Sequence, residues 1–317
     1  MAHTLIDPAL TRWRIDGAEL AYTDSGGDGA PLLLIHASGF ADWFTPLAAT
    51  PALGGYRVIR MVRAGYTGAP APGGLTVSDH AGHAAALLNR LKAAPAHVLA
   101  HSSGTTIALQ LALDHPELVR TLCLSEPPLL DSLAAPEDHE LLHATLGPAI
   151  GAALAATARG DLPAAFDLFM TAVCGPAYRE IMTGTLGADL VNEAENRCGY
   201  LFTDEILAVN AWTLDPEAVA SLRQPVVLIQ GGASSPLFHR LIAHLAGLIP
   251  DATVATIDAA DHLLPLTAPT KLAKLITDFC QPDRLVTPRP TWPAPTTVKA
   301  SADRSATAPD GQLAARK

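Results

Sequence analysis

The most constraining feature of the sequence is a serine between a short apolar run and a helical stretch. Residues His97 to Ala100 are typical of a buried strand, and Thr105 to His115 have helical spacing that Pro116 stops. The small residues Ala100 and Gly104 on either side of the turn would let strand and helix pass closely. A turn of this kind lifts Ser102 out at the carboxyl end of the strand, so we expect Ser102 to be a nucleophile. The alternative is a serine that only caps the helix.

Short apolar runs and helical stretches alternate along much of the chain. Asp16 and Gly17, flanked by β-rich runs, predict an N-terminal hairpin. Runs that are apolar on both faces predict strands buried between two helix layers. We therefore expect an α/β fold, a mostly parallel sheet with helices on both faces. The expected strands are Leu32–His36, Arg57–Val62, His97–Ala100, Thr121–Leu124, Pro225–Gln230 and Thr253–Ile257, and the expected helices Val77–Leu91, Thr105–His115, Leu237–Leu248 and Pro269–Phe279.

Two segments depart from this alternation. Residues 131–222 are rich in Ala and Leu with helical spacing and contain no convincing strand, which indicates a helical cap inserted into the core. The core would then comprise residues 1–130 and 223–281. Residues 282–317 combine several prolines with Ala, Ser, Thr and Lys, and we expect this tail to be disordered because it buries too little apolar surface.

Composition excludes several classes of partner. The net charge of −10 argues against nucleic acid or an anionic membrane, since both require clustered Lys and Arg. The four cysteines are scattered without metal spacing and are expected to be free, buried thiols.

The N-terminus has no signal-peptide pattern, and no apolar run reaches the roughly eighteen residues that span a bilayer. We expect a cytoplasmic protein that needs no metal and no cofactor, because no dinucleotide, phosphate-loop or metal motif occurs. The sequence leaves the oligomeric state open.

With these motifs in place, the chain from about Thr11 to Cys280 resembles the α/β-hydrolase family. The turn around Ser102 is similar to that family's nucleophile elbow, with Ala100 in place of its first glycine. Residues 57–66 are similar to a family loop in which an aspartate usually stands where this chain has Val62. That aspartate is structural, so the difference concerns loop packing.

The resemblance implies a base and an acid for Ser102. His262 follows the last expected strand, where the family carries its catalytic histidine; His36 and His101 are competitors. The usual acid position, after the strand ending at Gln230, holds Ser234 and Ser235 and no carboxylate. Glu126, at the end of the preceding strand, is the expected acid, as in certain lactonases. A solvated turn residue is the alternative.

The resemblance also implies an oxyanion hole and a substrate pocket. The backbone N–H groups of Ser103 and Ser38 are the expected oxyanion donors, and the Ser38 hydroxyl could add a contact. Aromatic side chains are expected to line a mostly apolar pocket, although each could equally belong to the core; they are Phe40, Trp43 and Trp212, with Tyr200 and Phe202 as further candidates.

These expectations describe a serine hydrolase that cleaves a small, mainly hydrophobic carboxylic ester or lactone through an acyl-enzyme. Two other functions stay open. The same residues could serve carbon–carbon bond hydrolysis or a cyclisation, and a non-catalytic member of the fold could bind a hydrophobic ligand. Turnover of a chromogenic ester would separate catalysis from binding.

Overall fold

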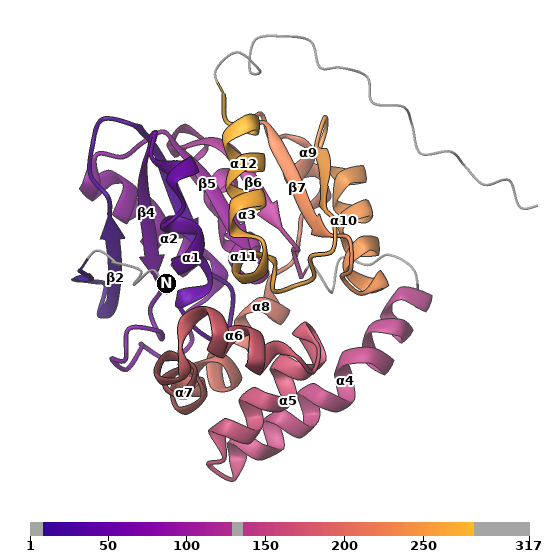
Figure 1. Cartoon of the computed structure of the whole chain (residues 1–317). Coiled ribbons are helices and arrows are strands. Elements are labelled where there is room, and N and C mark those ends of the chain that lie inside the picture. Colours follow the sequence, from indigo (N-terminus) through magenta and orange to yellow (C-terminus); the bar gives the residue numbers. More distant parts are fainter. Residues whose placement is uncertain (1–8, 129–135, 282–317) are drawn as a thin grey trace, which may run out of the picture.

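A computed structural model of the chain describes residues 9–128 and 136–281. Its centre is an eight-stranded sheet with the order β1-β2-β4-β3-β5-β6-β7-β8 (Figure 1). The first two strands form an antiparallel hairpin and β2 pairs antiparallel with β4, whereas all other pairs are parallel. The predicted α/β class with a mostly parallel sheet is therefore confirmed. The strands are β1 (Thr11–Ile15), β2 (Ala18–Asp24), β3 (Ala30–Ile35), β4 (Tyr56–Val62), β5 (Ala96–His101), β6 (Val119–Ser125), β7 (Val226–Gly231) and β8 (Thr253–Ile257).

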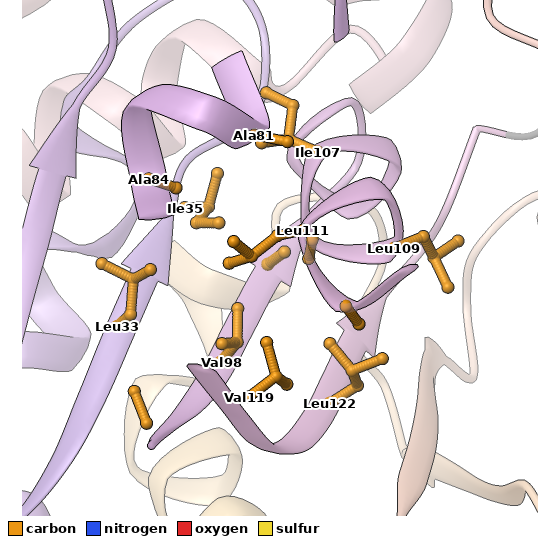
Figure 2. Packing of buried hydrophobic residues seen from close by; sticks show 14 of the residues in the cluster. Leu33, Ile35, Ala81, Ala84, Val98, Ile107, Leu109, Leu111, Val119 and Leu122 are labelled. Carbon is orange, nitrogen blue, oxygen red and sulfur yellow. The ribbon is translucent and has the colours of Figure 1, made fainter. Parts of the chain in front are cut away.

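Helices cover both faces of the sheet because its central strands are apolar on both sides. In β3, Leu33 and Ile35 pack on one face, whereas Leu32 and Leu34 pack on the other. Figure 2 shows the first of these layers, in which side chains of α2 and α3 meet those of β3, β5 and β6. The core helices are α1 (Thr45–Ala48), α2 (Val77–Leu91), α3 (Gly104–Asp114), α10 (Pro236–Leu248), α11 (Leu264–Thr267) and α12 (Pro269–Phe279), with short 3₁₀ turns η1 (Asp42–Phe44), η2 (Pro51–Leu53) and η3 (Pro116–Leu118).

A helical layer lies between β6 and β7 in sequence and below one end of the sheet in Figure 1. The described part of this segment, 136–222, contains helices and no strand. Its elements are α4 (Pro136–Ala158), α5 (Leu162–Cys174), α6 (Tyr178–Leu186), α7 (Ala188–Arg197), η5 (Leu201–Glu205), α8 (Ile206–Ala211) and α9 (Pro216–Ala220). The exact domain boundaries stay a prediction, and the expected disorder of residues 282–317 lies outside the described residues.

The sequence predicts no segment with the length and apolar character of a membrane span, but one helix has both. Within α4, Asp138–Ala158 is long and apolar enough to cross a bilayer by length and composition, and 22% of its most apolar window is buried. The sequence reading missed it because Glu140 and His143 interrupt any continuous apolar run. A single helix of this kind carries little weight, since core helices meet the same criteria.

Candidate active site

Ser102 lies in a sharp turn between β5 and α3. Its φ angle is +48°, in the left-handed region that non-glycine residues rarely occupy. Its N–H donates to the carbonyl of Ser125 at 2.9 Å, which ties the turn to the end of β6. A Cβ at Gly104 would come within 2.5 Å and 2.7 Å of the carbonyl oxygens of Ile35 and His36, so only glycine lets α3 start this close to β3. The local geometry is the sharp strand–turn–helix connection that a nucleophile elbow requires.

His262 and Glu126 are hydrogen bonded, although 136 residues separate them in sequence. His262 Nδ1 lies 2.9 Å from Glu126 Oε2, and both side chains are buried. Glu126 follows β6 and has a φ of +50°, while His262 lies in the loop between β8 and α11. The parallel sheet brings these two loops to the same edge as the turn at Ser102.

Other donors hold the Glu126 carboxylate. Its Oε1 accepts from the N–H of Gly231 at 2.8 Å and from the hydroxyl of Ser234 at 2.6 Å. Burial alone would raise the pKa of Glu126, but the hydrogen bond and charge of His262, together with Ser234 and Gly231, outweigh it and lower the pKa. The carboxylate is therefore ionised at neutral pH. Ser234, at the usual acid position, now supports the carboxylate of the neighbouring strand.

Aromatic rings fix the His262 imidazole. Phe238 of α10 stacks on it at 4.4 Å between ring centroids, and His101 and Trp43 lie 4.7 Å and 6.3 Å away. Ser102 Oγ and His262 Nε2, both in the described part of the chain, are not hydrogen bonded to each other. Such contacts are often long in unliganded enzymes and tighten with substrate.

The two competing histidines occupy other positions. His36 Nε2 accepts from the N–H of Arg63 at 3.2 Å, so the ring braces the segments after β3 and β4. The His101 ring is fully buried, with Nδ1 3.3 Å from the carbonyl of Ser125. Burial is the main cause that lowers the pKa of both imidazoles well below the ordinary value. Within the described residues neither ring is hydrogen bonded to Glu126.

The two residues whose amides are the expected oxyanion donors are joined through their side chains. Ser38 Oγ is 2.7 Å from Ser103 Oγ, which joins the loop after β3 to the start of α3. Among the described residues, neither backbone N–H has a protein acceptor, whereas the next amide, Gly39 N–H, donates to Tyr66 Oη at 3.0 Å. The Ser38 and Ser103 amides are thus free to bind a ligand oxygen.

A buried carboxylate from η5 lies directly behind these serines. Glu205 Oε1 accepts from Ser103 Oγ at 3.1 Å and from Arg63 at 2.7 Å, and Oε2 accepts from the Tyr66 hydroxyl. Arg63 also donates to the carbonyl of Ala37 at 3.1 Å. We call Arg63, Tyr66, Ser103 and Glu205 the Glu205 cluster. It connects the helical segment to the loop that carries Ser38.

Electrostatics keep this cluster ionised. Burial alone would raise the pKa of Glu205, but the charge of Arg63 and the hydrogen bond of Tyr66 lower it below its ordinary value. Burial alone would lower the pKa of Arg63, yet Glu205 raises it. Burial and the charge of Glu205 raise the pKa of the Tyr66 phenol. The result is a buried ion pair with a neutral phenol.

The buried ion pair makes stability depend on Glu205 and on pH. We expect Glu205→Ala to lower the free energy of unfolding by about 3–5 kcal/mol at pH 7, because it leaves Arg63 buried without a counter-charge. The folded pKa of Glu205 is lowered, so its contribution is present above the unfolded pKa of about 4.3 and is lost as pH falls through the folded value. Urea unfolding at pH 7 and at about pH 3, well below the unfolded pKa, should show the difference shrinking in acid. Glu180→Gln, an exposed carboxylate of α6, is the control, and an equal loss at both pH values would contradict the linkage.

The expected pocket residues fall into two places. Phe40 and Trp43 stack at 4.5 Å, and Trp43 Nε1 donates to the carbonyl of Ser38 at 2.9 Å, which places both beside the Ser38 loop. Trp212 lies elsewhere: its Nε1 donates to Gln110 of α3 at 2.8 Å, and its ring packs against the core. The structure therefore does not bring Trp212 to Phe40 and Trp43.

The two further aromatic candidates also separate. Tyr200 Oη lies 3.0 Å from His80 Nε2, and its ring borders a cavity of about 400 Å³ together with Gly39, Phe40 and Tyr66. Ser102 and His262 are not among the described residues that line this cavity. Phe202 is buried among the helices. In 9–128 and 136–281, no group of three or more His, Cys, Asp or Glu could hold a metal ion. The four cysteines are free and buried, as predicted.

The sequence reading missed the Glu205 cluster. Arg63 and Tyr66 stand in the loop quoted for the family resemblance, so their position was visible but their partner was not. Glu205 carries no motif, and the only local signal is an acidic pair in which Asp204 is half-buried and Glu205 fully buried. The five-residue π-helical turn that aims Glu205 inward, a feature frequent at functional sites, has no sequence pattern that we could have used.

Comparison with protein families agrees with this architecture. Residues 32–275 match the model of the alpha/beta hydrolase family, from the first parallel strand to the last helix. The match spans most of the chain, and the chain therefore belongs to the alpha/beta hydrolase family.

Individual relatives are more distant. The chain is 31% identical over 116 residues to the dihydrolipoyllysine-residue acetyltransferase component of the acetoin cleaving system of Cupriavidus necator, which covers 36% of this chain and 30% of that protein. The present chain covers less than half of the length of the curated relatives that it matches. Among solved structures it resembles an N-acyl homoserine lactone degrading enzyme (TM-score 0.65, 22% identity, 85% of this chain and 100% of that chain) and the enol-lactonase of Burkholderia xenovorans (TM-score 0.64, 20% identity, 85% and 99%). At these identities the structures show a shared fold.

Proposed function

We propose that this protein is a serine hydrolase that cleaves a carboxylic ester or lactone through an acyl-enzyme. The observation that carries the proposal is the hydrogen bond between His262 and the buried, ionised Glu126 at the edge of the sheet where the strained turn presents Ser102. A charged carboxylate on Nδ1 holds the proton there and leaves Nε2 as the acceptor. A binding protein has no need for such a pair.

In the proposed reaction, Ser102 Oγ attacks the carbonyl carbon as His262 Nε2 takes its proton. The N–H groups of Ser38 and Ser103 stabilise the oxygen that becomes negative, and the dipole of α3 favours that charge. His262 returns the proton to the leaving alkoxide as the carbon–oxygen bond breaks. Water, activated by His262, then attacks the acyl-enzyme, and Ser102 regains its proton.

The substrate we propose is small and mainly hydrophobic. We expect Phe40 and Trp43 beside the Ser38 loop, and Phe238 stacked on His262, to supply the apolar walls of its pocket. The lactone alternative gains support from the two lactone-degrading enzymes that share the fold. A cytoplasmic location and the absence of a nucleic acid or membrane partner stay predictions.

A serine-directed fluorophosphonate tests the nucleophile directly. We expect it to label the protein once, and peptide mass spectrometry should place the adduct on the peptide that contains Ser102. A panel of chromogenic esters and lactones should show turnover that the adduct abolishes. Labelling of another serine would contradict the proposal, and ligand binding without turnover or labelling would favour the non-catalytic alternative. Products of carbon–carbon cleavage or cyclisation would assign the same site to another reaction.

A further inference from the structure

The Glu205 cluster determines more than stability, because every polar neighbour of Glu205 donates to it. An ionised carboxylate can only accept hydrogen bonds. Arg63, the Tyr66 hydroxyl and the Ser103 hydroxyl all lie within hydrogen-bond distance of its oxygens. Each hydroxyl has a single proton, so a proton that points to Glu205 is no longer available to any other acceptor.

The Tyr66 branch shows this direction independently. Gly39 N–H can only donate, and it donates to Tyr66 Oη at 3.0 Å. The phenol must then send its own proton onward, and Glu205 Oε2 is the acceptor. The phenol keeps this proton and stays neutral, because burial and the charge of Glu205 raise its pKa.

The same reasoning determines the direction of the hydrogen bond between Ser38 and Ser103. Ser103 Oγ donates to Glu205 Oε1, because a bond to a charged acceptor is stronger than one to a neutral hydroxyl. Ser103 can then only accept from Ser38, so Ser38 Oγ donates its proton to Ser103 at 2.7 Å. The Ser38 hydroxyl therefore presents only lone pairs to any further partner. This removes the earlier expectation that it could donate to the oxyanion.

The Ser38 side chain is placed to meet a substrate. It is half-exposed, as is Ser102, whereas Ser103 and Glu205 behind it are buried. The amide and the hydroxyl belong to one residue, so a substrate whose carbonyl oxygen is held by the Ser38 amide comes close to the Ser38 hydroxyl, and we infer that the substituent on the adjacent carbon is the group that meets it. The Ser38 hydroxyl, as an acceptor, gains a hydrogen bond when that substituent carries an O–H or N–H. It is left without a partner when the substituent is a methyl or ether group.

We propose that Ser38, oriented by Ser103 and Glu205, is a specificity-determining residue that selects esters or lactones with an O–H or N–H on the carbon next to the scissile carbonyl. The proposal rests on the hydrolase function proposed above and adds a polar requirement at one carbon to an otherwise hydrophobic substrate. Selectivity of this kind arises because a polar group in the site loses its partner with the wrong ligand.

A matched pair of chromogenic esters tests the selectivity. The p-nitrophenyl esters of hydroxyacetic and methoxyacetic acid differ in the donor and in one methyl group. We expect wild-type kcat/KM to favour the hydroxy ester about tenfold. Ser38→Ala removes the acceptor, and Ser103→Ala frees the Ser38 hydroxyl to rotate and donate outward. Both variants should bring the ratio to within about twofold, while Ser78→Ala, an exposed serine of α2, keeps the wild-type ratio. A wild-type ratio near one, or a ratio that neither variant changes, would overturn the proposal.

Binding separates this inference from the proposed function. In Ser102→Ala protein, calorimetry with α-hydroxy-γ-butyrolactone and its α-methoxy analogue should show the same preference without turnover, and Ser38→Ala in that background should remove it. Selective binding without Ser102-dependent hydrolysis would refute the hydrolase proposal and keep the role of Ser38. Ser102-dependent hydrolysis with no preference in either assay would support the hydrolase proposal and refute the role of Ser38.

Discussion

Replacing Ser102 with alanine is expected to lower kcat by about 10⁶-fold, since in the proposed mechanism Ser102 is the residue that forms the acyl intermediate. The neighbouring Ser103 does not substitute for it. Ser103 is buried and its hydroxyl proton is directed at Glu205. Without Ser102, the oxyanion amides and the ordered base would leave only a residual acceleration over water.

Kinetic and structural readouts should be taken on the same Ser102→Ala preparation. Steady-state rates with the best ester of the panel give the loss of kcat, and thermal unfolding checks that the fold persists. Alanine keeps the Cβ at the strained turn, so the unfolding temperature should stay close to that of the wild type. Ser78→Ala should retain full activity. A loss of less than about tenfold with an intact fold would exclude Ser102 as the nucleophile.

Much of the fold could be predicted because hydrophobic runs have simple physical causes. A strand buried on both faces must be largely apolar. β3 is such a run, and β4, β5 and β6 are mainly apolar with a few polar residues, among them Arg60, His97 and Thr121. Capping signals set the start of α2, where Thr76 and Asp79 form a reciprocal capping box. The hairpin was visible from Asp16 and Gly17, which both have positive φ angles. Most observed ends differ from the predicted ones by one or two residues, which is the usual variation of helix and strand ends.

The pairing of His262 with Glu126 could be predicted from the sequence, because the topology of a parallel sheet brings the two residues together. Carboxyl ends of parallel strands share one edge, so residues just after β5, β6 and β8 are brought together. Glu205 and Trp212 had no such constraint. Both lie in a helical segment whose packing against the sheet depends on tertiary contacts, and a helical pattern does not state what its buried face meets. The acceptor role of Ser38 depends on Glu205 and could not be inferred before it.

The geometry around Glu126 supports the proposal that the acid stands one strand away from its usual position in the family. Gly231 and Ser234, at the end of β7 where the acid is usually found, both donate to Glu126 Oε1. The usual site thus provides the donors that orient a carboxylate from β6. This leaves Oε2 for His262 and assigns each oxygen a separate role.

That division of roles predicts a large effect for the isosteric change Glu126→Gln. The Gly231 N–H can only donate, so the carbonyl oxygen of glutamine should occupy the Oε1 position and its NH₂ group should face His262 Nδ1. Nδ1 must then accept, which places the imidazole proton on Nε2, where it cannot take the proton of Ser102. We expect kcat to fall by about 10⁴-fold with little change in structure, as when a catalytic histidine is held in the wrong tautomer.

Ser234→Ala is the matched comparison, because it removes one donor to the same carboxylate and leaves its charge. Loss of one hydrogen bond to an ionised carboxylate, about 1.5–3 kcal/mol, should cost at most about ten- to hundredfold in kcat. Steady-state rates of both variants across pH 5–9, with unfolding curves as the check on folding, separate the two effects. Nearly full activity in Glu126→Gln together with a collapse in Ser234→Ala would place the orienting group after β7, and the tautomer argument would then have to be abandoned.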